Sequence, residues 1–296
     1  MDEPPFARPN LLAASRIAIL GMGLMGGSLA LALRGGCLEI LGIDPDARAR
    51  ELALARGAAG RVAADPAELL PEADVVILAA PVLAILRLLD ALPALHPGSP
   101  IVLDLGSTKR HIVQAMEKLP ARFDPLGGHP MCGKETHTMR SAEAGLFKDR
   151  PFAFIPLERT SQRARQLAQE IAIALGARPL WLDANTHDRW AAATSHAPYL
   201  IANALSAATP LEAQSALAGS GYRSATRIAA TPPEIMGDIL ATNGEHVLAA
   251  LAAFRAQLDT LETHLAQSNW TALAVQLQRG AELRRNIDQP PSGGPA

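Results

Sequence analysis

The first chemically suggestive feature is a glycine-rich loop near the N-terminus, Gly21-Met22-Gly23-Leu24-Met25-Gly26. It follows a short apolar run directly and precedes a helical stretch. In such loops the first glycine permits a tight turn, the second lets the backbone approach a pyrophosphate, and the third packs the helix against the strand. The helix N-terminus then faces the phosphates. The motif predicts a bound dinucleotide, although by itself it also occurs as an ordinary glycine-rich turn.

An acidic residue, Asp44, ends the next β-like run. It follows the glycine loop by about 20 residues, the spacing at which a carboxylate binds a ribose diol. It would repel a 2′-phosphate, and no arginine follows it directly, so NAD is expected rather than NADP. Ala80, Pro81 and Ser107 end later β-like runs. Because ligands bind at the carboxyl ends of parallel strands, these three residues are the expected neighbours of the nicotinamide.

A candidate base, His129, stands in the segment Gly127-Gly128-His129-Pro130. We expect this histidine on a loop after a strand, where an imidazole can take a proton from a substrate hydroxyl near neutral pH. A single histidine in a loop is often only structural. Because Ser107 lies at the neighbouring strand end, a catalytic role for His129 is as plausible as a structural one. The residues alone leave both roles open.

The elements that must position these residues alternate between 16 and 183. Short β-like runs, separated by helical stretches, lie at 17–20, 40–44, 75–81, 101–104, 152–155 and 179–182. Continuous apolar strands of this kind are typical of a mainly parallel sheet covered on both faces. The fold class is therefore α/β, with an N-terminal Rossmann-type dinucleotide-binding domain at 1–183.

The pattern changes after residue 184, where no convincing strand run remains. Helical stretches are predicted at 186–207, 233–242, 244–266 and 270–287. We expect an all-helical substrate and dimerisation domain at 184–296, with a disordered tail from about 289. Apolar positions are dense within 247–265, which favours a helix face buried against a second subunit and hence a homodimer.

The overall composition limits the class of protein. The chain has 296 residues, 49% hydrophobic and 19% charged, which suits a packed core. Its net charge is -2 and it has no run of Lys or Arg, so neither nucleic acid nor an anionic membrane is an expected partner. Two cysteines, Cys37 and Cys132, lack metal-ligand spacing. With no signal peptide or membrane helix recognised, we expect a cytoplasmic protein without a metal site.

Six segments, in this order, carry a family resemblance: GMGLMGGSLALAL, VVILAAP, DLGSTK, GGHPMCGKE, HDRWAAATSHAPY and GYRSATRIA. Together they resemble the prephenate/arogenate (cyclohexadienyl) dehydrogenase family of tyrosine biosynthesis, over residues 16–287. The segments GGHPMxG and SHxP with a downstream TRIA are specific, whereas the glycine loop is not. The resemblance implies an NAD-dependent enzyme that decarboxylates prephenate and/or arogenate oxidatively, yielding 4-hydroxyphenylpyruvate and/or tyrosine with CO2 and NADH.

The resemblance also implies roles for single residues. His129 would accept the proton of the substrate hydroxyl, and Ser107 would orient the hydroxyl or the histidine. Arg227 would hold a carboxylate through charge-assisted hydrogen bonds. Ser195 and His196 would reach into the cleft from the first helix of the second domain. The pair His187-Asp188, two turns earlier on that helix, would either support the site or cap the helix.

Two departures from the family leave the substrate open. Some members have a histidine in place of Tyr199, where it contacts the substrate side chain. A tyrosine cannot be cationic, and the loss of this potential positive charge favours arogenate slightly as the substrate. Lys134 adds positive charge and tilts back toward prephenate, and Glu135 could pair with Arg227 or meet an amino group. The expected substrate is a cyclohexadienol, with the choice between the two undecided.

Two other classes of protein share parts of this pattern. A β-hydroxyacid dehydrogenase or an imine-forming reductase also joins a dinucleotide domain to a helical one. The β-hydroxyacid enzymes use a lysine on the first long helix after the junction, and 186–207 contains none. A non-catalytic regulator that senses NAD(H) would not need His129, Ser107 and Arg227 together.

Overall fold

The structure is a computed structural model, which describes residues 10–134 and 136–287. The tail predicted from about residue 289 lies outside the described residues. Contacts divide the chain into two compact units, Met1–His246 and Val247–Ala296. The predicted domain boundary after residue 183 stays a prediction.

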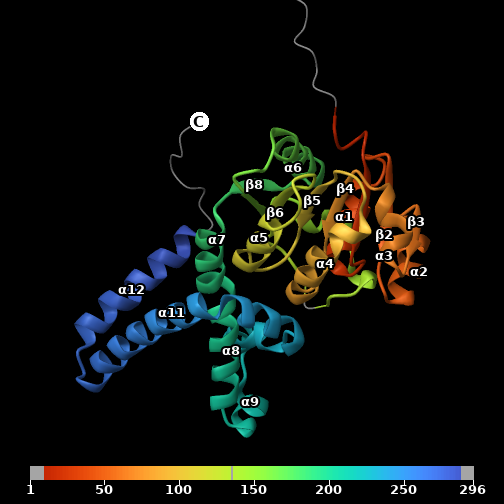
Figure 1. Ribbon diagram of the computed structural model, residues 1–296. Helices are drawn as coiled ribbons and strands as arrows, with labels where there is room; N and C mark the ends of the chain where they lie inside the picture. Colours follow the sequence, from red (N-terminus) through yellow and green to blue (C-terminus); the bar gives the residue numbers. More distant parts are fainter. Residues whose placement is uncertain (1–9, 135, 288–296) are drawn as a thin grey trace, which may run out of the picture. The chain divides into compact units, whose positions relative to one another are not determined.

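Among the described residues, eight strands form one sheet (Figure 1), in the order β3-β2-β1-β4-β5-β6-β7-β8. The strands are β1 (Arg16–Leu20), β2 (Glu39–Ile43), β3 (Arg61–Ala63), β4 (Val75–Leu78), β5 (Ile101–Asp104), β6 (Asp124–Pro130), β7 (Pro151–Pro156) and β8 (Arg178–Trp181). Every neighbouring pair is parallel except β6 and β7, which run antiparallel. The mainly parallel Rossmann-type sheet predicted from the sequence is confirmed.

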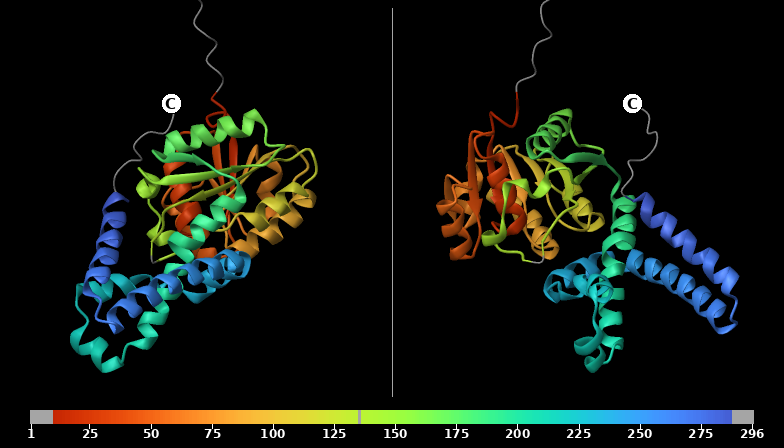
Figure 2. Two further views of the ribbon diagram at one scale, coloured as in Figure 1. Left: turned by 90° about the vertical axis from the view of Figure 1, so that its left-hand side faces the viewer. Right: turned by 180° about the vertical axis from the view of Figure 1, so that it is seen from behind.

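Helices cover both faces of this sheet, as Figures 1 and 2 show. In β1, Ile17 and Ile19 point into one apolar core, while Ala18 and Leu20 point into the other, as the two-residue period of a strand requires. The first core includes α1 (Leu24–Leu33), α2 (Ala47–Ala55) and α6 (Gln162–Leu175). The second includes α3 (Pro66–Leu69), α4 (Val82–Leu95) and α5 (Arg110–Glu117). Burial on both faces explains why the central strands β4 and β5 are continuous apolar runs.

The described residues after β8 form helices joined by short turns. The helices are α7 (Ala184–Ala191), α8 (Ala197–Ala208), α9 (Leu211–Leu217), α10 (Ser220–Thr226), α11 (Pro233–Ala266) and α12 (Trp270–Asn286). The single helix predicted at 186–207 is interrupted by a π-helical turn, Ala192–His196. The helices predicted at 233–242 and 244–266 join into α11, with one non-helical residue, Asn243, between them.

The start of α11 is fixed to the nucleotide-binding part of the first unit by polar contacts. The Asp238 carboxylate accepts a hydrogen bond from the Leu83 amide at the start of α4, at 3.0 Å. The hydroxyls of Thr242 and Thr108 lie 2.8 Å apart and share a buried hydrogen bond. These contacts hold the first ten residues of α11 over the carboxyl ends of β4 and β5 (Figure 1).

The second unit contains α11 from Val247 onward together with α12, drawn in blue in Figure 2 as a helical hairpin. Gln276 on α12 donates a hydrogen bond to the Gln257 side chain on α11, at 3.4 Å. No helix in the described part of the chain is both long enough and apolar enough to cross a membrane.

Candidate active site

The glycine loop forms a turn between β1 and α1 that only glycine can form at two of its positions. Gly21 has a φ of 102°, and a side chain there would overlap the Ala79 carbonyl oxygen on β4's far end. A Cβ at Gly26 would overlap the carbonyl oxygen of Gly21, so the third glycine lets α1 pack directly against the turn. The turn therefore holds the N-terminus of α1 close to the carboxyl edge of the sheet.

The second glycine faces a backbone group of the chain itself. The His137 carbonyl accepts a hydrogen bond from the Leu24 amide at 2.9 Å, and a Cβ at Gly23 would lie 2.9 Å from the same oxygen. From the sequence, Gly23 was predicted to let the backbone approach a pyrophosphate. In the structure, the backbone that lies against Gly23 is the loop between β6 and β7, whose His137 carbonyl oxygen accepts a hydrogen bond from the Leu24 amide at the start of α1.

Asp44 lies beside the glycine turn, just beyond β2. One carboxylate oxygen accepts the Met22 amide at 2.7 Å, and the other accepts the Asp46 amide at 2.8 Å. Each oxygen keeps a further lone pair, since a carboxylate can accept about four hydrogen bonds. The carboxylate is thus fixed in orientation and can still accept hydrogen bonds from a diol in the adjoining cavity.

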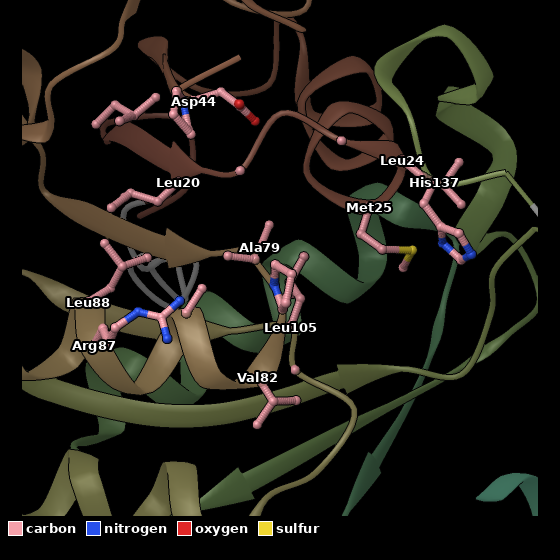
Figure 3. A pocket seen from close by; sticks show the side chains of 18 of the residues that line it. Leu20, Leu24, Met25, Asp44, Ala79, Val82, Arg87, Leu88, Leu105 and His137 are labelled. Carbon is pink, nitrogen blue, oxygen red and sulfur yellow. The ribbon is translucent and has the colours of Figure 1, made fainter. Parts of the chain in front are cut away.

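A cavity of about 850 Å³ runs along the carboxyl edge of the sheet (Figure 3). This volume lies within the range of cofactor sites. Residues predicted as cofactor neighbours line it: Gly21, Gly23, Leu24, Met25, Asp44, Ala80, Pro81 and Ser107. Met22 and Gly26, also predicted there, do not line it, because Met22 is buried in the core and Gly26 is covered by the turn. The lining is mainly apolar, and it fits a dinucleotide that contacts Asp44 and the start of α1.

Cys132 also lines this cavity and carries no free thiolate. Burial raises the pKa of its thiol to about 11, against a smaller opposing effect of the Arg150 charge. A thiol that stays protonated at neutral pH is a poor nucleophile. Cys132 therefore acts as a small apolar side chain.

A buried carboxylate, Asp104 at the end of β5, fixes the two strand ends that carry Ser107 and His129. Its oxygens accept the Gly106 amide at 2.8 Å and the Gly128 amide at 3.1 Å. Each of these glycines directly precedes one of the two candidate catalytic residues. Asp104 thereby fixes the position of the loop that carries Ser107 relative to the strand that carries His129.

The charge of Asp104 is matched by a fully buried lysine. Lys109 donates to the Asp104 carboxylate and to the Gly128 carbonyl, the latter at 2.6 Å. Burial lowers the pKa of Lys109, and the Asp104 charge opposes that shift. Buried charges of this kind persist only when paired and hydrogen-bonded.

His129 lies inside β6, where it is paired with Ala153 of β7. The loop predicted for it is therefore wrong. Gly127 and Gly128 disfavour a strand by propensity, but a Cβ at Gly128 would lie 2.6 Å from the Asp104 carbonyl oxygen. Close backbone packing explains the glycines, and strand pairing overrides their propensity.

A chain of hydrogen bonds leads from His129 to a buried carboxylate. His129 Nδ1 lies 2.8 Å from His187 Nε2, and His187 Nδ1 lies 2.8 Å from Asp188 Oδ1. His187 and Asp188 are both buried, on α7. Since an ionised carboxylate only accepts, His187 Nδ1 carries a hydrogen and its Nε2 accepts from His129 Nδ1. The Nε2 of His129 is then the nitrogen with a free lone pair.

Asp188 also caps a helix that is not its own. Its two oxygens accept the Lys109 and Arg110 amides at 2.7 and 2.9 Å, at the N-terminus of α5. Burial would raise the pKa of Asp188, but the hydrogen bonds from His187 and these amides outweigh it, and the net pKa is lowered. The carboxylate stays ionised at neutral pH, favoured by the positive end of the helix dipole.

His129 is neutral at physiological pH. Its pKa is held well below the ordinary value, first by burial and then by electrostatic repulsion between a protonated His129 and the protonatable neighbours His187, Lys109 and His196. Neutral imidazole with a defined tautomer can accept a proton at Nε2. The predicted role of His129 as a base is thus compatible with its surroundings.

His196 lies in the π-helical turn before α8. The amide of Asn243, at the break in α11, donates to His196 Nδ1 at 3.2 Å and to the Asp188 carbonyl at 2.8 Å. Burial lowers the pKa of His196 to about 4, so the ring is neutral and presents an N–H at Nε2. Ser195 occupies the same turn and is exposed.

The remaining predicted substrate residues lie apart from this cluster. Tyr199 belongs to a small apolar cluster with Met236, and its hydroxyl faces the Thr231 carbonyl at 3.5 Å. Arg227 begins the 3-10 turn after α10 and is exposed. Lys134 forms an ion pair with Glu143 at 2.8 Å. Glu135 lies outside the described residues.

Three residues that organise the site have no predicted role in the sequence, namely Asp104, Lys109 and Asn243. The first two were visible as the ends of DLGSTK, a segment with two charges in an apolar setting. Asp188 was expected to support the site or cap its own helix, whereas Asp183 is the residue that caps α7. Nothing in local sequence marked Asn243, since its partners are 55 and 47 residues away.

The sheet, the glycine turn and the cavity define a nucleotide-binding dehydrogenase of the Rossmann type with an added helical region. Family models for the nucleotide-binding and dimerization domains of prephenate dehydrogenase match residues 29–180 and 183–279. The chain belongs to the prephenate dehydrogenase family.

Individual relatives agree with this family. A prephenate dehydrogenase of Bacillus subtilis is 30% identical, over 86% of this chain and 71% of its own length. A solved prephenate dehydrogenase from A. aeolicus, in complex with hydroxyphenyl propionate and NAD+, is similar with a TM-score of 0.86 at 25% identity, covering 94% of this chain and 99% of that one. A Synechocystis arogenate dehydrogenase has a TM-score of 0.80 at 28% identity, with 92% and 99% covered.

Proposed function

We propose that this chain catalyses the NAD-dependent oxidative decarboxylation of a cyclohexadienol, prephenate and/or arogenate, in tyrosine biosynthesis. The observation that carries the proposal is the hydrogen-bonded chain from His129 through His187 to Asp188, the last two of which are buried. This chain leaves the His129 Nε2 as a proton acceptor. The dinucleotide cavity reaches the adjoining strand end at Ser107. Proton acceptance beside a hydride acceptor is the chemistry that oxidation of an alcohol requires.

NAD, when bound, supplies the acceptor for the hydride that leaves the hydroxyl-bearing ring carbon. His129 Nε2 accepts the hydroxyl proton as the carbon–oxygen double bond forms. The imidazolium so produced is stabilised through His187 by the Asp188 charge, in the way an aspartate supports the histidine of a catalytic triad. The ring carboxylate then leaves as CO2, its bonding electrons complete the aromatic ring, and His129 returns the proton to the phenolic oxygen.

Other residues have supporting roles in this proposal. Ser107 hydrogen-bonds the substrate hydroxyl or His129, and His196 offers its Nε2–H to a substrate oxygen. Arg227 binds a substrate carboxylate, for which its planar pair of donors is suited. Tyr199, Lys134 and Glu135 stay candidates for contacts with the side chain that distinguishes prephenate from arogenate, and Ser195 for a contact in the cleft.

The dinucleotide-binding part is proposed to span residues 1–183, and the substrate and dimerisation part residues 184–296. The match of residues 183–279 to a dimerization domain supports a homodimer. A small-molecule substrate and a second copy of the chain are the proposed partners. A cytoplasmic location fits two cysteines that are both free thiols.

The test is a comparison of initial rates with prephenate and arogenate, each with NAD and with NADP. We expect NADH together with 4-hydroxyphenylpyruvate or tyrosine, one product molecule for each NADH. NAD should be preferred over NADP because of Asp44. Binding of NAD without reduction by either substrate would contradict the proposal and favour an NAD(H)-sensing protein.

A further inference from the structure

One arginine lines the dinucleotide cavity on the side of α4. Six residues of this helix line the cavity. Beyond Val82 at its start, they follow helical spacing: Ala84, Arg87, Leu88, Ala91 and Leu95. Steps of three and four residues place side chains on one helix face. Arg87 is therefore the charged member of an otherwise apolar stripe along the cavity.

The wall near Asp44 is also apolar. It is formed by Ile43, Pro45, Ala64 and Pro66, which follow β2 and β3. Figure 3 shows Asp44 on one side of the cavity and Arg87 with Leu88 on the other. Among the lining residues at this end, Asp44 and Arg87 carry the only charges.

The position of Asp44 determines which part of a dinucleotide reaches this end. If the diphosphate lies at the start of α1 and Asp44 binds the ribose diol, the base on that ribose lies beyond Asp44, between the two apolar walls. That base is a flat aromatic ring. An apolar slot recognises such a ring through its faces, and a guanidinium stacks on an aromatic face through cation–π attraction.

The guanidinium of Arg87 is available for this contact. In the described part of the chain no hydrogen bond or ion pair occupies it, and the residue is exposed. Neighbouring arginines differ in this respect. Arg56 donates to the carbonyls of Met139 and Ala142, both at 2.7 Å, and Arg61 is tied to Glu39 and Glu72.

We infer that Arg87 is a cofactor-binding residue that stacks its guanidinium on the adenine ring of the bound dinucleotide. The inference rests on the proposed function, since it takes the Asp44 end of the cavity as the adenosine end. It assigns to Arg87 affinity for adenosine, and leaves discrimination against a 2′-phosphate to Asp44. Arg87 has no part in the chemical step.

The experiment measures binding of ADP-ribose by titration calorimetry, which needs no turnover. Arg87→Ala should raise its Kd about 3- to 20-fold. Arg87→Lys should retain part of the affinity, because it keeps a cation but loses the plane. The matched control is Arg163→Ala, an exposed arginine on α6 away from the cavity, which should bind like the wild type.

Kinetics give a second readout. The KM for NAD should rise in Arg87→Ala, while kcat at saturating NAD and the KM for the second substrate stay unchanged. An unchanged Kd for ADP-ribose in Arg87→Ala would overturn the inference. So would a loss confined to 2′-phospho-ADP-ribose, which would make Arg87 a phosphate ligand. If wild type binds no ADP-ribose, the proposed cofactor site itself fails, and the inference fails with it.

Discussion

At the scale of single residues, the tautomer of His129 depends on a carboxylate two side chains away. Asp188 accepts from His187, and His187 accepts from His129, so the lone pair of His129 is on Nε2. The lowered pKa of His129 keeps this nitrogen unprotonated. Because a base with a depressed pKa loses activity only below that pKa, kcat/KM should hold its plateau to pH values under the usual 6.5 of histidine.

Asp188→Asn tests the chain of hydrogen bonds from His129 through His187 to Asp188. Without the negative charge, the imidazolium of His129 loses its support, and kcat should fall roughly 10²- to 10⁴-fold. The acid limb of kcat/KM should move to lower pH, since protonated His129 is destabilised. KM values for NAD and substrate should change little. Initial rates across pH measure all of these.

The control for Asp188 is Asp183→Asn, which makes the same chemical change at another helix cap. Asp183 accepts the Thr186 amide at 2.9 Å and caps α7 only. Because Asn caps a helix about as well as Asp, this variant should lose no more than about 0.5 kcal/mol of stability and keep its pH profile. Equal effects of the two variants on kcat and on pH dependence would mean that Asp188 acts merely as a cap.

At the scale of elements, the pair Asp104–Lys109 joins β5, β6 and the start of α5. Lys109→Met leaves a buried carboxylate without its counter-charge, and we expect a loss of about 3–5 kcal/mol in the free energy of unfolding. Adding Asp104→Asn should recover part of that loss. Urea unfolding of the single and double variants measures the coupling.

Lys118→Met is the reference for this pair, because Lys118 is exposed at the end of the same helix. A surface change of this kind alters stability by no more than about 0.5 kcal/mol. Equal stability of the Lys109 and Lys118 variants would contradict a structural role for the buried pair.

The elements also show how far sequence patterns reach. All six predicted strands are present. Five of them are apolar runs that record burial on both sheet faces, whereas β8 lies at the sheet edge and its residues Arg178–Leu180 are exposed. β3 was missed because it has three residues and lies at the sheet edge. β6 was missed because it contains glycines, of which Gly128 is required by close packing against the Asp104 backbone. The π-helical turn at Ala192–His196 left no periodic signal.

The candidate site divides in the same way. Glycine conformations and the acidic residue after β2 follow from local rules, so Gly21, Gly26 and Asp44 could be interpreted from sequence. The contact of His129 with His187 joins residues 58 apart. The docking of α7 on α5 through Asp188 depends on tertiary packing, which no local pattern encodes.

At the scale of the whole molecule, the second unit carries an apolar stripe. Leu251, Phe254, Leu258, Leu261 and Leu265 of α11 follow a spacing of three and four residues, typical of helices that pack against a partner helix. Leu258 is 48% exposed and Leu265 57% exposed. Apolar side chains exposed in a row mark an interaction surface.

We expect a homodimer in solution, with this stripe in its interface. Leu258→Glu combined with Leu265→Glu should weaken the dimer at least about tenfold, because two charges would be buried in an apolar contact. Light scattering over a concentration series measures the mass. Ile173→Glu, which replaces an apolar residue 79% exposed on α6, is the control and should leave the mass unchanged. A wild-type monomer at all concentrations would rule out the interface.

The central claim is that His129 accepts the substrate proton while NAD takes the hydride. The most direct measurement is NADH formation by wild type and by His129→Asn, with prephenate and with arogenate, at concentrations where calorimetry shows that NAD and substrate are bound. The wild type should form NADH and the phenolic product with one or both substrates. The variant should bind both ligands and lose at least about 10²-fold in kcat. Near-normal turnover by His129→Asn would contradict the claim.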